Sequence, residues 1–134
     1  MSDPDHVRFH ARSVVLEHPD GFCHLLGFAD DPSSPRHYLM LQRDFEHIEA
    51  VEEAPAYYLE WCGPEGGGWG GVETVTQTTD SLALTFEAAV ARMLGLRALT
   101  ITFVASEVDA AALSEGLRRI FQGCGARLSL IDPA

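Results

Sequence analysis

Apolar and polar residues alternate along most of the chain with the two-residue period of half-buried β-strands. Leu82, Leu84 and Phe86 alternate with smaller or polar neighbours, and the run from Leu99 to Phe103 repeats the pattern. The same criteria predict further strands at Val7 to Leu16, Phe22 to Phe28, Tyr38 to Arg43, Ala56 to Cys62, Val72 to Thr79 and Arg127 to Ile131. The chain is therefore predicted to contain about seven or eight strands.

A helical period replaces this alternation near the C-terminus. Leu113, Leu117, Ile120 and Phe121 fall on one stripe, and charged residues lie on the other faces. This spacing predicts an amphipathic helix that packs its apolar stripe on the sheet. Gly123 is expected to end it.

Three other features concern helix boundaries. Ser106 is expected to cap the amphipathic helix, with Asp109 in the position of the usual capping-box acid. Glu87 to Leu94 is predicted to form a brief helix ended by Gly95. The segment from Asp44 to Ala54 fits either a short amphipathic helical turn or an acidic loop.

Short, turn-rich connections separate the predicted strands. Pro19-Asp20-Gly21, for example, predicts a hairpin turn between the first two strands. Short connections favour antiparallel pairing. The 134 residues are the usual size of one domain, and no repeat or linker divides them. We therefore predict a single α+β domain spanning residues 1–134, with one substantial C-terminal helix packed on a mainly antiparallel, curved sheet.

The chain is strongly acidic. Nine Lys and Arg residues stand against twenty Asp and Glu, which gives a formal net charge of -11. Nucleic acids and anionic membranes would be repelled by this charge and are not expected partners. A basic protein, such as a basic nuclease, would be attracted and would associate faster. Solubility alone is the other explanation of the acidity.

Cysteine usage and hydropathy bear on location. Cys23, Cys62 and Cys124 are an odd number at wide spacing, which favours reduced thiols over a disulfide framework. The N-terminus, MSDPDHVRF, contains no apolar stretch resembling a signal peptide. No run of about eighteen apolar residues is present. We expect a cytoplasmic protein.

The most distinctive segment joins two tryptophans. Tyr57-Tyr58-Leu59-Glu60-Trp61 leads through the glycine-rich run from Gly66 to Gly71, which contains Trp69, into Glu73. The run lacks the Lys-Ser/Thr pair of a phosphate-binding loop. We expect its glycines to allow positive φ or a bulge that directs Trp69 either into the core or toward a partner.

Candidate catalytic groups are sparse. Glu60 and Glu73 flank the glycine run, and they would form an acid–base pair only if the fold brought them into one cleft with an aromatic wall. Surface residues and partner contacts are the other interpretations of both. His6 and His10 share a predicted strand face, but no second pair or carboxylate at ligand spacing supports a metal site. We expect no catalytic residues, no metal and no cofactor.

The densest negative stretch contains Asp44, Glu46, Glu49, Glu52 and Glu53. Runs of charge usually form solvated faces. If the protein binds a basic active site, we expect this stretch to imitate phosphates there.

The order of these motifs resembles that of the immunity protein 10 family of bacterial polymorphic toxin systems, over Val7 to Phe121. The matching segments are Gly27-Phe28-Ala29-Asp30, Tyr38-Leu39-Met40-Leu41-Gln42-Arg43, Tyr57-Tyr58-Leu59-Glu60-Trp61, Gly70-Gly71-Val72-Glu73 and Glu115-Gly116-Leu117-Arg118-Arg119-Ile120-Phe121. The resemblance implies a small cytoplasmic protein, encoded beside a toxin, that neutralises the toxin by binding it. It does not specify the toxin.

The resemblance and the residue pattern together predict a protein-binding function. We chose partner-binding candidates for their acidity and aromatic character, because aromatic anchors with charged surroundings dominate many interfaces. They are Asp44, Glu46, Glu49, Glu52, Glu53, Tyr58, Glu60, Trp69 and Glu73. A small enzyme or ligand-binding domain with a Trp/Glu-lined pocket is the alternative function. A homodimer is a further possibility that the sequence leaves open.

Overall fold

The computed structural model describes residues 6–17, 23–31, 33, 36–44, 57–63, 67–121 and 126–130. The side chains of residues 17, 23, 24, 44, 67 and 69 are outside this description. The predicted turn at Pro19-Asp20-Gly21, most of the segment from Asp44 to Ala54, and Gly123 also lie outside the described residues.

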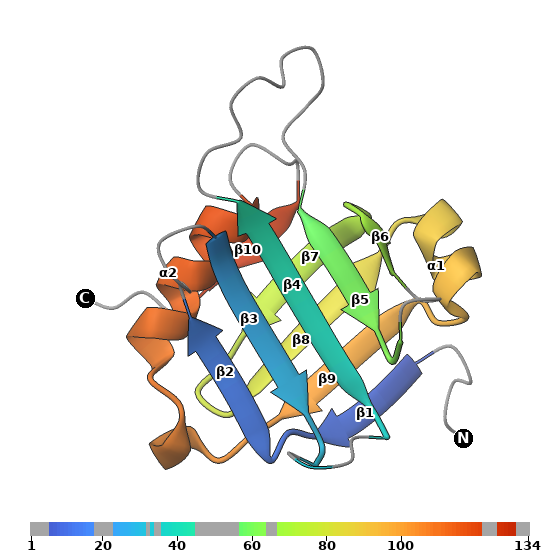
Figure 1. Ribbon diagram of the computed structural model, residues 1–134. Helices are drawn as coiled ribbons and strands as arrows, with labels where there is room; N and C mark the ends of the chain where they lie inside the picture. The colour runs from blue at the N-terminus through green and yellow to red at the C-terminus, as the bar shows by residue number, and fades with distance from the viewer. Residues whose placement is uncertain are drawn as a thin grey trace.

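Two five-stranded sheets form the two layers of the described molecule (Figure 1). Sheet A has the order β1 (His6–His10), β9 (Ala98–Thr102), β8 (Ser81–Phe86), β7 (Val72–Gln77) and β10 (Arg127–Ser129). Sheet B has the order β2 (Ser13–Glu17), β3 (Cys23–Ala29), β4 (Tyr38–Asp44), β5 (Tyr58–Trp61) and β6 (Gly67–Trp69). The strands of one sheet cross those of the other, as in sandwiches whose chain passes between sheets at corners.

The α+β class and the mainly antiparallel pairing are confirmed, but the predicted single curved sheet is wrong, because the strands form two sheets. The β1–β9 and β7–β10 pairs are parallel, and the other neighbouring strands are antiparallel. Sheet B is built from one continuous stretch of sequence, whereas sheet A pairs the first strand with strands near the C-terminus. Local alternation shows which side of each strand is buried. It does not show that each sheet is buried against the other.

The chain first crosses from sheet A to sheet B within the segment from Val7 to Leu16, which was predicted to be one strand. Ala11 donates its backbone N–H to the carbonyl of Thr102 in sheet A (2.7 Å), and Arg12 donates to that of Ala29 in sheet B (2.8 Å). Two consecutive residues therefore pair with different sheets. The alternation continues through the corner, so the sequence pattern alone predicts one strand.

The chain crosses back from sheet B to sheet A at the glycines between β6 and β7. Gly70 and Gly71 adopt φ values of 77° and 103°, which glycine adopts without the steric cost of a side chain. A Cβ on Gly71 would lie 2.3 Å from a methyl carbon of Val90. The prediction of positive φ is confirmed at these two glycines, and the predicted direction of Trp69 lies outside the described side chains.

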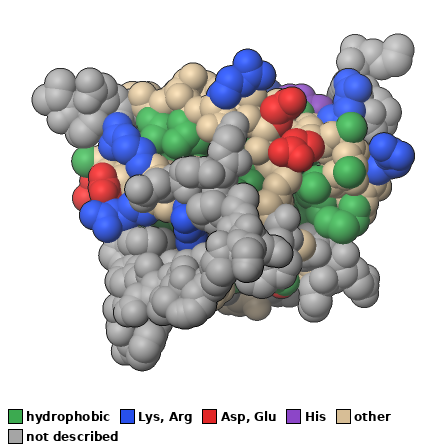
Figure 2. Space-filling view, turned by 90° about the horizontal axis from the view of Figure 1, so that it is seen from above, with side chains coloured by type: hydrophobic (Ala, Val, Ile, Leu, Met, Phe, Trp, Pro, Cys, Tyr) green, Lys and Arg blue, Asp and Glu red, His purple; other side chains and the backbone are tan. Residues whose placement is uncertain are grey.

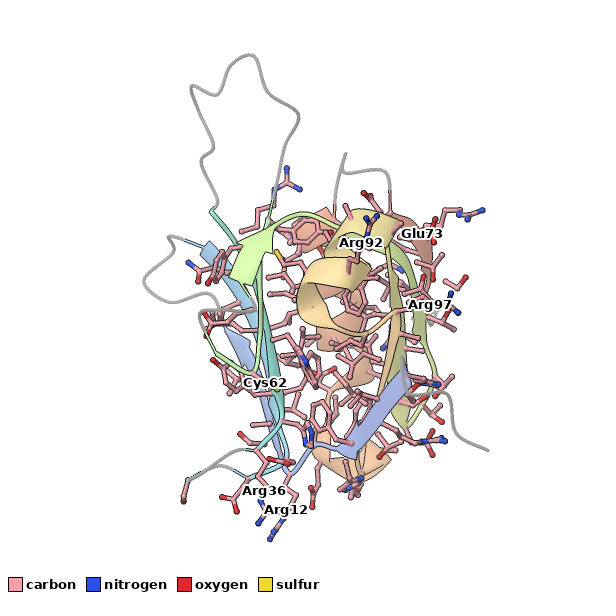
Figure 3. The ribbon with its side chains drawn as sticks, turned by 90° about the vertical axis from the view of Figure 1, so that its right-hand side faces the viewer. Arg12, Arg36, Cys62, Glu73, Arg92 and Arg97 are labelled. Carbon is pink, nitrogen blue, oxygen red and sulfur yellow. The ribbon has the colours of Figure 1, made fainter. Side chains whose placement is uncertain are left out.

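The core fills the space between the layers, seen edge-on in Figure 3. Both sheets contribute every second residue to it, including Leu39 and Leu41 from β4 and Leu82 and Leu84 from β8, all fully buried. This burial follows the predicted alternation, and apolar burial supplies most of the stabilisation of such a domain.

Helix α2 (Ala110–Phe121) closes one side of the sandwich, and the short helix α1 (Ala88–Leu94) lies at the opposite side (Figure 1). The stripe of α2 is confirmed, because Leu113, Leu117, Ile120 and Phe121 are buried. The helix packs on β2, β3 and β4. It also bonds to sheet A, since the hydroxyl of Ser114 donates to Oε1 of Gln77 at 2.7 Å.

Asp109, and not Ser106, caps α2. Residues Ala105–Glu107 form a separate 3-10 turn, and Val108 is extended after it. The helix therefore begins later than the capping-box pattern predicts. Oδ1 of Asp109 accepts the backbone N–H of Ala112 at 3.0 Å, as an N-cap side chain does. The predicted end of α1 at Gly95, with φ 80°, is confirmed.

Candidate functional site

A row of five residues runs across sheet B, and the site is built on it. The strand register places Val15 opposite Gly27, Gly27 opposite Met40, Met40 opposite Glu60, and Glu60 opposite Gly67. Their neighbours along each strand include core residues, so the row lies on the outer face of sheet B. The described side chains of the row are partly buried.

Two tyrosines hold the carboxylate in this row. The hydroxyl of Tyr58 donates to Oε1 of Glu60 at 2.7 Å, and the hydroxyl of Tyr38 donates to Oε2. Tyr38 lies on β4 and Tyr58 on β5, in the rows on either side of Glu60. We call Tyr38, Tyr58 and Glu60 the tyrosine–glutamate cluster.

The cluster changes the acidity of both phenols. The hydrogen bond to Glu60, followed by burial and the negative charge of Glu60, raises the pKa of Tyr38 to about 12. The same causes, in the same order, raise the pKa of Tyr58. Both phenols therefore keep their protons, and remain hydrogen-bond donors, to a higher pH than an ordinary tyrosine. A carboxylate held from two sides is a fixed negative group with lone pairs still open to a further donor.

Asp30 holds the two residues that precede Tyr38. Its carboxylate accepts the backbone N–H groups of Arg36 (2.9 Å) and His37 (3.2 Å), and its Oδ2 lies 3.4 Å from Nδ1 of His37. Burial acts to raise the pKa of Asp30, but the hydrogen bonds from His37 and Arg36 lower it, and the net shift is downward. These bonds hold the backbone of Arg36 and His37, which leads directly into β4 at Tyr38.

An apolar hollow of about 330 Å³ adjoins the cluster on the same face. Its lining includes Val15, Leu25, Gly27, Ala29, Tyr38 and Met40. Gly27 stands at the centre of the row and has no side chain, while Val15 and Met40 rise on either side of it. The hollow is therefore a consequence of one glycine in the middle of a sheet face.

Glu60 and Glu73 do not form the acid–base pair that the alternative function requires. Glu60 belongs to β5 of sheet B, whereas Glu73 is exposed on β7 of sheet A. In Figure 3, Glu73 is labelled beside one sheet and Cys62 beside the other. Cys62 is two positions after Glu60. The two carboxylates share no cleft. The alternative pocket with an acid and a base is therefore wrong in its central requirement.

The structure describes the two tryptophans to different extents. Trp61 packs inward, with its ring centroid 5.7 Å from that of His37 and 6.0 Å from that of Phe9. It does not line an outer pocket. Trp69 is the backbone partner of Tyr58 in the β5–β6 pair, and its side chain is outside the described part.

The predicted partner-binding residues are therefore only partly placed. Tyr58 and Glu60 are brought together, and Glu73 is on the other sheet. Asp44 is described only in its backbone, at the end of β4. Glu46, Glu49, Glu52 and Glu53 lie outside the described residues.

The described body is close to neutral. All nine basic residues are arginines with described side chains, and nine acidic residues have described side chains. The other eleven acids are Asp3, Asp5, Glu17, Asp20, Asp44, Glu46, Glu49, Glu52, Glu53, Glu65 and Asp132. Figure 2 shows that the arginines on the face it presents are spread over it and do not gather into one basic patch. The net charge of -11 therefore resides in the side chains that are not described.

The histidine pair of β1 bonds to its neighbouring strand. Nε2 of His6 lies 2.8 Å from Oγ1 of Thr100, and Nδ1 of His10 lies 2.9 Å from Oγ1 of Thr102. Within the described ranges, no group of three or more His, Cys, Asp or Glu residues is placed to hold a metal ion. Both histidines are exposed.

Sequence reasoning missed Tyr38, Gly27 and Met40 as parts of this site. Tyr38 and Glu60 are separated by 22 positions, and only the β4–β5 register brings them together. The available signal was parity: Gly27, Met40 and Glu60 each have the opposite parity to the core residues of their strands.

The fold and this face define a small α+β sandwich with one apolar, carboxylate-bearing sheet surface. The chain belongs to the immunity protein 10 family, whose model matches residues 10–112. A search among curated proteins finds no significant match. Neither α-helix in the described part has the length and apolar character needed to cross a membrane.

Proposed function

We propose that this protein neutralises a cognate toxin of a polymorphic toxin system by binding it directly, in the cytoplasm of the cell that makes both. The observation that carries the proposal is the family match over residues 10–112. Binding requires an accessible surface and no reactive groups. The tyrosine–glutamate cluster and its hollow supply a surface of that kind.

Charge supports a basic toxin, for example a nuclease. A net charge of -11 would attract a basic protein at long range. Asp44, Glu46, Glu49, Glu52 and Glu53 would supply much of that attraction, whereas Glu73 is exposed on sheet A and is not assigned to the interface. Tyr58, Glu60 and Trp69 would act as close-range contacts.

The direct test is co-expression with the toxin domain encoded by the adjacent gene. We expect the protein to restore survival and to elute with a catalytically inactive form of that domain in gel filtration. A toxin domain from an unrelated system serves as the control and should be neither neutralised nor bound. Failure to rescue and to bind the adjacent toxin would contradict the proposal.

A second test separates attraction from contact. Replacing Glu46, Glu49, Glu52 and Glu53 together by glutamine should slow association at low salt and change dissociation little, because charges at an interface rim act mainly on the association rate. The difference from wild type should shrink as ionic strength rises. Association rates that are equal at low salt would remove this segment from the proposal.

A further inference from the structure

Arginine is absent from the described outer face of sheet B. The outward positions whose side chains are described hold Ser, Val, Leu, Gly, Ala, Tyr, Met and Gln, and Glu60 is the one charged residue among them. Arg43 of β4 has the opposite parity, and its guanidinium donates to the carbonyls of Arg119 and Ile120 at the end of α2. Arg12 and Arg36 precede β2 and β4 (Figure 3). Among the described side chains, this face of a near-neutral body therefore presents a carboxylate and no arginine.

The negative group and the apolar hollow are adjacent. Met40 is the direct strand partner of Glu60 on one side and of Gly27 on the other. The hollow at Gly27 and the carboxylate are therefore separated by one side chain. The tyrosine hydroxyls engage each oxygen of Glu60 once, and each oxygen retains capacity to accept from an arginine or lysine.

We propose that this face binds a cationic element of the toxin, in which an arginine or lysine meets Glu60 and a neighbouring apolar side chain enters the hollow over Gly27. This inference rests on the proposed function, and it assigns close contact to sheet B and not to the acidic stretch. Fixed tyrosines around one charge, beside an apolar depression, match the composition of interface centres.

Charge complementarity favours such a partner over a second copy of this chain. A two-fold dimer brings the same patch of both copies together. Here the patch of each copy would present Glu60 with no described arginine to meet it. An arginine-bearing or lysine-bearing toxin surface would supply the missing cation.

The experiment measures affinity for the inactive toxin domain with two matched pairs of variants. Glu60→Gln keeps the shape and acceptor oxygen but removes the charge, and Glu73→Gln makes the same change on sheet A. Gly27→Val fills the hollow, and Ala83→Val enlarges a residue on the outer face of sheet A. A Cβ at Gly27 would meet only Val15, at 3.7 Å, so this variant should fold, and a β-branched residue suits a strand.

We expect Glu60→Gln and Gly27→Val each to weaken binding at least about tenfold, with Glu60→Gln also reducing the salt dependence. Glu73→Gln and Ala83→Val should stay within about twofold, because they change a face that is not part of the interface. Thermal unfolding of all four variants, recorded in parallel, verifies that they are folded.

Each result separates the inference from the function on which it rests. If wild type binds and rescues while neither sheet B variant loses affinity, the inference is overturned and the toxin-binding function stands. If wild type fails to bind and rescue, the function itself fails. If the protein alone is a dimer that Gly27→Val dissociates, a second copy occupies this face and the inference is overturned.

Discussion

The outer faces of the two sheets differ in how their polar groups are satisfied. Sheet A presents threonine, serine and histidine, and these side chains bond to one another across strands: Oγ1 of Thr74 lies 2.6 Å from that of Thr85, and His6 and His10 contact threonines of β9. In its described part, sheet B presents an apolar hollow and a carboxylate held by two tyrosines. Two sheets of the same strand number and the same core thus have contrasting surfaces.

This contrast indicates that the outer face of sheet A is solvated and that the outer face of sheet B is suited to binding a partner. A sheet with one solvated face normally alternates apolar and polar residues, as sheet A does. Sheet B keeps the inward apolar residues but also places Val15, Leu25 and Met40 outward. Stability of the isolated domain does not require outward apolar residues, and an apolar surface patch commonly marks an interaction site.

The largest effect is expected from placing a cation on the apolar face. Met40→Arg would stand between Gly27 and Glu60, so it would fill the hollow and pair with the carboxylate. We expect toxin affinity to fall by about 100-fold, or about 2.7 kcal/mol. Ala83→Arg on sheet A should change it less than about twofold. Equal losses in calorimetric titrations of the two variants would remove the distinction between the faces.

A smaller effect separates binding from stability. The double variant Tyr38→Phe/Tyr58→Phe removes both donors to Glu60, and we expect about a tenfold loss of affinity, or about 1.4 kcal/mol. Its unfolding free energy should also fall, because the same hydrogen bonds stabilise the fold. Thr85→Val on sheet A should affect stability alone. It breaks the bond to Thr74 and should lower unfolding free energy by about 1 kcal/mol without affecting binding.

Urea unfolding and toxin titration of these variants measure both quantities. A double tyrosine variant that loses stability but keeps its toxin affinity would make the cluster a structural feature of sheet B. The comparison between faces would then lose its functional meaning.

The smallest effect is spectroscopic and concerns pH. Tyr38 has its pKa raised to about 12 from an ordinary value of 10, so the folded protein holds this proton more tightly than the unfolded chain. The stabilisation is present below pH 10 and is lost as pH rises from about 10 to about 12. Absorbance near 295 nm should show a late-titrating tyrosine that is absent in Tyr38→Phe. Identical titrations of the two proteins above pH 11 would contradict the cluster geometry.

The sequence predicted features that depend on residues close together in the chain better than features that depend on distant residues. Alternation in Leu82, Leu84 and Phe86 and the stripe of α2 reflect local burial, and both were predicted correctly. The parallel pairing of β1 with β9 depends on residues more than ninety positions apart, and alternation carries no information on such pairing. Ser106 was the wrong cap because a 3-10 turn intervenes.

The same distinction between near and distant residues applies to the site. Tyr58 and Glu60 are two positions apart on one strand, so parity alone places them on one face. Tyr38 joins them through the β4–β5 register, and Glu73 departs because the chain crosses to sheet A at Gly70 and Gly71. Residues close in sequence around the glycine run therefore end on opposite layers.

The most direct test of toxin binding at sheet B uses the methionine methyl groups. The chain contains three methionines, Met1, Met40 and Met93. Met40 lies in the central row of the outer face, and Met93 is 52% exposed on α1. Protein labelled with ¹³C at these methyls would be titrated with the inactive toxin domain, with Met40→Leu and Met93→Leu used for assignment. The account predicts a large shift of the Met40 signal and little change at Met93, whereas an unshifted Met40 signal in the saturated complex would contradict it.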